Sequence, residues 1–434
     1  MNIYQFQEAF GAADKTSKAM RQAISQWHSM YYQQPETADS FPCQRIPYTL
    51  VNKITKAVFG EYQSRCSDPV AEQWLRSLEQ IRREAMQLSL MGGSCYIKPC
   101  PTQAGFSYTL IPRKNVLIFG RDSRGVPTDV GTAERSTEGN FYYTLLERRK
   151  LEGNGMLRME NRLYRSRDPQ KLGSETSLKE LARYADLPKS WRYPLGSVGL
   201  VQMRTPMVNC VDGSGDAVAV FAPAIQLIQA IDRNERQLMA EFDRGESRII
   251  VSRDLLDPEK NLTDHLFVGL DEDPEQVGIT LFSPNLREQS FLARKQEYLR
   301  NVESIIGLKR GMLSDANMEE RTATEIAASS AEYALTVMDF QQMWEQAARE
   351  TVALCRELAI LYGLPAGEEP QLSFEWGNGV LYDQEKVWAD YMDLVARGLL
   401  KPEIALGWRF GEEAKTPQQQ AAIRQRWMPN KEEV

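Results

Sequence analysis

The stretch that decides the fold lies between Asn285 and Pro365 and reads GLKRGMLSDANMEERTATEI at its centre (residues 307–326). Apolar residues at helical spacing come before and after this polar centre, so the stretch predicts a helix, a short loop and a second helix.

The second of these helices has clear start and stop signals. Thr322 and Glu325 form a capping box, in which their side chains satisfy free backbone N–H groups at a helix start. Gly363 and Pro365 supply the stop. Neither Gly nor Pro occurs over 322–362, which predicts a rod of about 60 Å at ~1.5 Å per residue. A helix of that length exceeds the needs of one small domain and indicates a large, oligomeric assembly.

The long helix carries apolar side chains whose spacing alternates between four and three residues, as in a heptad seam. Two alternatives follow: the seam packs along its own domain, or it also packs between neighbouring subunits. The second is favoured because few monomers supply a core of that length. The side chains expected at the subunit contact are Tyr333, Val337, Phe340, Trp344 and Leu354.

The loop from Gly307 to Arg321 mixes basic, acidic and apolar side chains. It lacks the GxxxxGK[ST] pattern of a nucleotide-binding loop. It is either a solvated connection or a mobile loop that contacts something sliding past it. Mixed charge suits the second alternative because each contact to a phosphate would add drag. The residues expected to make that contact are Lys309, Arg310, Met312, Leu313, Asp315, Asn317, Met318 and Glu319.

Composition describes an ordered, soluble protein. The 434 residues can hold more than one core, with 42% hydrophobic and 26% charged residues. No apolar run approaches the ~20 residues of a membrane span, and no secretory signal begins the chain. We therefore expect the chain to stay in the cytoplasm of the producing cell. Six cysteines without a CxxC pair predict reduced, mostly buried thiols.

Charge and motif content argue against tight DNA binding and against catalysis. A net charge of −7 is unlike that of a protein that grips nucleic acid statically. Only two histidines are present, and hydrolase signatures such as GxSxG and HExxH are absent. No enzyme activity, cofactor or metal is expected. The acidic cluster of Asp254, Asp257, Asp264 and Asp271 does not have the spacing of a calcium loop.

The remaining chain predicts an α+β fold. Helical patterns cover about 1–35, 48–62 and 69–91, and a β-rich middle contains a hairpin around Gly153–Gly155. Residues 212–217 form a Gly-rich linker. A helix begins near Phe221 and ends at Gly245, and the insert from Arg248 to Asn285 has three strand-like runs. A strand, a helix and a polar helical tail follow the long helix.

This order of elements resembles a tailed-bacteriophage portal protein of the siphophage type. FAPAIQLIQAIDRNERQLMAEFDRG (221–245) resembles the first stem helix, and the segments quoted above resemble the tunnel loop and long helix. IPYTLVNKITKAVFGEY (46–62) is also similar to stretches of this group. The resemblance implies an elongated α+β subunit with a mixed wing, a helical stem, a small β-containing clip and a long helix after a tunnel loop. Its parts are an N-terminal arm (1–39), wing (40–220), first stem helix (221–247), clip (248–284), second stem helix (285–306), tunnel loop (307–321), long helix with return to the wing (322–398) and a short helical tail in place of a full crown (399–434).

The resemblance also implies a function. Such a protein forms a ring, usually a dodecamer, at one capsid vertex, and double-stranded DNA passes through it without sequence preference. It docks the terminase motor, the capsid or scaffold protein and the head–tail connector; the four aspartates of the insert would serve the motor or connector. Its place would be the virion, after assembly in the host cytoplasm. Two rivals stay open: another head or tail structural protein, and a metal-dependent nuclease built on the insert carboxylates.

Overall fold

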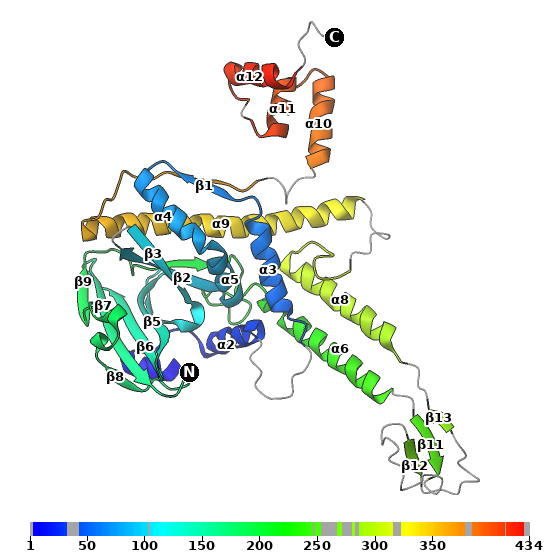
Figure 1. Ribbon diagram of the computed structural model, residues 1–434, viewed down its shortest axis with the longest axis horizontal. Helices are drawn as coiled ribbons and strands as arrows, with labels where there is room; N and C mark the ends of the chain where they lie inside the picture. The colour runs from blue at the N-terminus through cyan, green and yellow to red at the C-terminus, as the bar shows by residue number, and fades with distance from the viewer. Residues whose placement is uncertain are drawn as a thin grey trace. The chain divides into compact units, whose positions relative to one another are not determined.

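The computed structural model describes residues 3–32, 43–102, 105–245, 248–252, 267–270, 280–282, 286–315, 323–377, 384–412 and 414–428. The chain divides into two compact units, Met1–Thr55 with Cys66–Gln371, and Lys56–Arg65 with Leu372–Val434. Helices and strands both contribute substantially, which confirms the predicted α+β class (Figure 1). Among the described helices, none is long and apolar enough to cross a membrane.

The larger sheet of the first unit is an antiparallel array in the order β4-β5-β6-β7-β8, with β9 paired to β7. The predicted hairpin is confirmed: Leu151 pairs with Leu157 across a turn in which Gly155 has φ 75°. That left-handed conformation favours glycine. The strands are β4 (Val116–Arg121), β5 (Pro127–Glu138), β6 (Phe141–Leu151), β7 (Leu157–Ser166), β8 (Ser174–Thr176) and β9 (Ser190–Tyr193).

Helix α1 (Ile3–Phe10) covers one face of this sheet. Its Phe6 and Phe10 are buried against Phe119 and Leu146, and the rings of Phe10 and Phe119 meet edge to face at 5.4 Å. A Cβ added to Gly131 would lie 2.7 Å from the ring of Phe119, so this strand position has room only for glycine. Burial of each aromatic ring contributes roughly 1.5–3 kcal/mol.

A smaller antiparallel sheet has the order β10-β2-β3, formed by β2 (Ser94–Thr102), β3 (Gly105–Pro112) and β10 (Val201–Arg204). Lys98 of β2 contacts Glu147 of β6 at 3.2 Å, and the same carboxylate accepts from Arg149 at 2.6 Å. Burial alone would raise the pKa of Glu147, but these two cations lower it to about 2. The two sheets are therefore joined by a buried, paired carboxylate.

The helices before β2 are α2 (Lys18–Tyr32), α3 (Ile46–Val58), α4 (Pro69–Gln80) and α5 (Arg82–Gly92). Asp68 caps α4 by accepting from the N–H groups of Val70 and Ala71. The single helix predicted over 69–91 is wrong. Ile81, at φ −98° and ψ 1°, ends α4 and begins α5, because this backbone conformation interrupts the helical hydrogen-bond ladder.

The predicted helices and strands after residue 221 are present with similar bounds. Helix α6 spans Ile225–Arg244, α8 spans Glu288–Ile306 and the 40-residue α9 spans Ala323–Tyr362. Between α6 and α8 lies a three-stranded sheet: β11 (Arg248–Ser252) is parallel to β12 (Phe267–Leu270) and antiparallel to β13 (Thr280–Phe282). Their division into stem, clip and tunnel loop stays a prediction.

The second unit contains a two-stranded sheet, β1 (Gln63–Cys66) with β14 (Leu372–Glu375), and helices α10 (Gln384–Ala396), α11 (Pro402–Phe410) and α12 (Pro417–Trp427). Phe410 and Trp427 stack with ring centroids 4.0 Å apart. Thr416 begins α12 with a capping box. The expected helical tail is therefore a set of short, mutually packed helices.

Candidate functional site

Helices α6 and α8 lie side by side (Figure 1). On α6, Ile228, Ile231 and Leu238 recur at helical spacing and are buried. Among them lies the buried Asn234, whose amide donates to the backbone carbonyl of Phe291 in α8 at 3.0 Å. This polar contact inside an apolar seam fixes how the two helices are aligned.

The loop after α8 starts at Gly307, which has φ 75° and ends the helix in a left-handed cap. The N–H of Leu308 donates to the carbonyl of Glu303 at 2.8 Å, and the Leu308 side chain is buried. A Cβ on Gly307 would lie 2.5 Å from Oγ1 of Thr336 in α9. Glycine is therefore required both by the backbone conformation and by the close approach of α9.

A fully buried carboxylate, that of Glu303, organises the loop. It accepts hydrogen bonds from the backbone N–H groups of Gly311, Leu313 and Ser314, and from the Ser314 hydroxyl at 2.8 Å. Burying an ionised carboxylate costs roughly several kcal/mol unless hydrogen-bond donors of the protein replace the water that it loses. The Glu303 side chain therefore holds residues 311–314 in place by accepting their hydrogen bonds.

Two further contacts fasten the same loop. Lys53 of α3 donates to the carbonyl of Met312. The N–H of Asp315 donates to Oε1 of Gln296 in α8 at 2.8 Å. Contacts from α3 and α8 thus fix the loop, and its first half has a defined backbone and side-chain conformation.

The structure places the predicted loop residues in three groups. Lys309, Arg310 and Asp315 are exposed, whereas Met312 and Leu313 are half-buried. Asn317, Met318 and Glu319 lie outside the described residues. Sequence reasoning missed Glu303, which carries the loop; its signal was an acidic residue within the apolar face formed by Leu299, Val302 and Ile306.

The long helix buries its predicted seam within its own chain. Tyr333, Val337, Phe340, Trp344 and Leu354 are each at most 9% exposed. Helix α9 packs against α4, β2 and β10 of the same unit. This burial is what the first alternative, packing along its own domain, expects. Side chains already covered leave little surface for a neighbouring subunit, so a contact between subunits would have to use the other face of α9.

The four aspartates assigned to docking, Asp254, Asp257, Asp264 and Asp271, lie outside the described residues, and their role stays a prediction. Over the part of the chain that is described, no group of three or more His, Cys, Asp or Glu could hold a metal ion. Of the six cysteines, Cys95 and Cys355 are buried, and Cys43 and Cys210 are exposed. Burial raises the pKa of Cys355 to about 12, so this thiol stays protonated.

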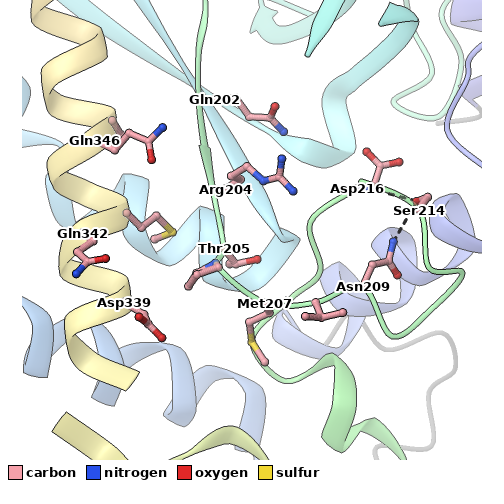
Figure 2. A pocket seen from close by; sticks show the side chains of 14 residues that line it. Gln202, Arg204, Thr205, Met207, Asn209, Ser214, Asp216, Asp339, Gln342 and Gln346 are labelled. Atoms are coloured by element: carbon pink, nitrogen blue, oxygen red, sulfur yellow. Dashed lines mark hydrogen bonds between the residues drawn. The ribbon is translucent and has the colours of Figure 1, made fainter. Parts of the chain in front are cut away.

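A hollow of about 560 Å³ lies beside β10 and is bordered by α9 (Figure 2). Gln342 and Gln346 of α9 line one side, and the segment that follows β10 lines the other. Two of its charged groups are engaged in structural contacts: Arg204 donates to the carbonyl of Gly215 at 3.1 Å, and Asp216 pairs with Arg121. These contacts hold the Gly-rich linker in place rather than present a reactive group.

One family model matches the part of the chain that contains these elements. The family model described as "Phage portal protein, SPP1 Gp6-like" matches residues 127–425, which is more than half of the chain and includes α6, the β11–β13 insert, α8, the loop and α9. The chain belongs to the SPP1 Gp6-like phage portal protein family. The resemblance inferred from the sequence is therefore confirmed, and the protein is a structural component of phage-type particles.

Other comparisons add little to the portal assignment. A search of curated proteins finds no match. Among solved structures, the chain is similar to one described as "Neck of native GTA particle computed with C12 symmetry", at 12% identity and a TM-score of 0.49, covering 93% of this chain and 96% of that chain.

Proposed function

We propose that this portal protein assembles into a closed ring that forms the DNA channel at one capsid vertex. The ring would be a dodecamer, as is usual for portal proteins of the type that the sequence resembles. Double-stranded DNA would enter through the ring during packaging and leave through it during ejection. The single observation that supports the proposal is the family match over residues 127–425, which covers the whole helix–insert–helix–loop–helix region.

In this proposal the loop held by Glu303 faces the channel. Lys309 and Arg310 are exposed just before the anchored segment, and Asp315 is exposed just after it. Cations beside a carboxylate contact a passing phosphate backbone weakly, because attraction and repulsion offset each other. The buried carboxylate keeps the loop in shape while DNA moves past it.

The insert between α6 and α8 would dock the terminase motor before packaging and the head–tail connector after it. The capsid or scaffold protein would contact the ring from outside. The motor supplies the work, and the portal supplies a channel and a platform. Assembly would take place in the host cytoplasm, and the mature location would be the capsid vertex.

The ring is tested by native mass spectrometry of the purified chain at micromolar concentration. The expected result is one dominant closed oligomer. Only monomers and dimers would argue for the alternative, another head or tail structural protein. Heterologous contacts between identical chains close into a ring when the rotation between them closes, so a ladder of open oligomers would also contradict the proposal.

A further inference from the structure

One side of the α6–α8 pair carries a dense cluster of arginines. A groove of about 630 Å³ lies there, lined by Arg233, Arg236, Arg244, Arg287 and Arg294, with Glu241 as the carboxylate among its charged side chains. Five cations against one anion leave a local charge of +4. We call this surface the arginine groove.

The cluster follows from helical spacing. Arg233, Arg236 and Arg244 recur at intervals that keep them on one face of α6, while Arg287 and Arg294 share one face at the start of α8. Because the two helices pack side by side, these two rows border the same groove.

Two of the arginines are positioned by their own neighbours. Arg287 donates to both carboxylate oxygens of Glu241, at 2.9 and 2.7 Å, which raises the pKa of the guanidinium. The Nε of Arg294 donates to the hydroxyl of Tyr298 at 2.8 Å, and its guanidinium lies 5.3 Å from that ring's centroid. Arg233, Arg244 and Arg294 are exposed. Guanidinium groups are thus presented to solvent with part of their freedom already restricted.

The charge of this groove runs against that of the chain, which is −7 overall. Clustered like charges raise the free energy of a folded surface unless an anion neutralises them. The planar fork of arginine matches phosphate oxygens in pairs, so a cluster of arginines suits a polyphosphate better than a single carboxylate.

Three carboxylates on or beside the helix face that carries these arginines are engaged within their own chain. Asp232 accepts from the N–H of Gln44 at 3.0 Å, Glu235 pairs with Lys295 at 3.0 Å, and Glu241 is held by Arg287. Carboxylates already engaged in their own chain offer little to a neighbour's guanidinium groups. These pairings favour a partner that brings its own negative charge.

We propose that the arginine groove binds the phosphate backbone of double-stranded DNA; the inference rests on the proposed function and adds a specific phosphate contact away from the loop. The contact is sequence-independent, since no base edge is needed to satisfy the guanidinium groups. It would add a phosphate contact to the weaker ones that the loop makes with passing DNA.

The test compares two triple variants of the full chain with equal change in charge. The first, R233Q/R244Q/R294Q, removes three exposed cations from the groove and keeps the Arg287–Glu241 pair. The control, R76Q/R124Q/R192Q, removes arginines that are 62–84% exposed at their side chains in the β-rich part and in α4. Binding of a short fluorescent DNA duplex is measured by anisotropy over a series of salt concentrations.

The expected result is a loss of affinity of about tenfold or more for the groove variant, and a salt slope lower by roughly 2–3, because each lost phosphate contact removes about 0.9 from the slope. The control should stay close to wild type. Equal DNA affinity of the two variants would overturn the inference. It would also be overturned if the groove variant bound DNA as wild type but no longer formed rings, because the groove would then contact a neighbouring copy of the chain. Mass spectra of the same samples separate the two failures: absence of wild-type rings counts against the proposed function, not against the groove.

Discussion

The carboxylate of Glu303 accepts from the backbone N–H of Ser314 at 2.9 Å, which joins the last turn of α8 to the loop that leads toward α9. The contact spans eleven residues of sequence, and both residues are buried. A loop that is polar in sequence is therefore organised around a buried carboxyl group. The shape of this loop is therefore set by the Glu303 side chain.

Glu303→Gln tests whether the Glu303 carboxylate holds the loop in place. A neutral amide accepts at one oxygen only and leaves at least one loop N–H without a partner, so the free energy of unfolding should fall by about 2–3 kcal/mol. Hydrogen exchange at residues 311–314 should accelerate. The matched control is Glu297→Gln on the same helix, whose side chain is 61% exposed and which should change stability by less than about 0.5 kcal/mol. Unchanged hydrogen exchange at residues 311–314 in Glu303→Gln would show that this carboxylate does not hold the loop in place.

Gly307→Ala tests the close approach of α8 and α9. The left-handed backbone costs a non-glycine residue about 1 kcal/mol, and the clash with Thr336 should bring the loss to about 2–4 kcal/mol. Gly363→Ala is the control, since Gly363 has φ 66° and a Cβ there meets nothing within 4 Å. Thr336→Ala should rescue Gly307→Ala to the level of the control in thermal unfolding. Equal losses at Gly307 and Gly363 would show that the clash does not exist.

Stability should fall in acid because of Glu147. Its pKa is about 2 in the folded chain against 4.5 as the ordinary value, so its contribution is complete above pH 4.5 and is lost as the pH falls toward 2. The shift corresponds to about 3 kcal/mol at most. Burial and then Lys114 lower the pKa of His28 to about 4, so His28→Gln removes a separate loss between pH 6.5 and 4. Denaturant unfolding across pH compares His28→Gln with the double variant His28→Gln/Glu147→Gln, and the difference in acid loss between pH 4.5 and 2 measures the Glu147 effect. The same acid loss in both variants would contradict it.

The sequence predicted the long helix well because its signals are local. The glycine stop and the uninterrupted spacing act within a few residues, and α9 ends at Tyr362 as expected. The predicted cap at Thr322 lies outside the described residues. The insert strands and the hairpin at Gly155 were found for the same reason. The break at Ile81 was missed because the apolar pattern continues through it.

The partners of the site residues could not be predicted because they come from distant parts of the chain. Lys53 reaches the loop from α3, and Thr336 meets Gly307 from the following helix. The seam of α9 was visible as a pattern, but the pattern could not say whether its own sheet or a neighbour covers it. The burial of the seam within one chain is what packing along its own domain expects, and the contact between subunits stays a prediction.

The two faces of α9 should respond differently to truncation. Trp344→Ala removes a fully buried ring and should cost about 3–5 kcal/mol of unfolding free energy. Leu335, which is 63% exposed, lies on the other face of α9, the face left for a contact between subunits. Leu335→Glu should leave the unfolding free energy of the chain within about 0.5 kcal/mol and reduce the ring fraction in native mass spectra. Intact rings in Leu335→Glu would remove this face from the interface.

The loop cations should affect DNA retention and not assembly. Lys309→Gln with Arg310→Gln removes both exposed cations before the anchored segment, so particles should contain less DNA while rings remain intact. Lys179→Gln with Arg183→Gln makes the same change in charge at exposed positions of the β-rich part. DNA content per particle is measured by the ratio of nucleic acid to protein absorbance. Equal DNA content in both double variants would disprove a channel role for these two side chains.

Electron microscopy of the purified chain tests the proposed ring most directly. We expect hollow rings of a single size, with α6 and α8 packed side by side around a central opening wide enough for duplex DNA. Compact particles without a central opening, at concentrations where the chain is folded, would contradict it.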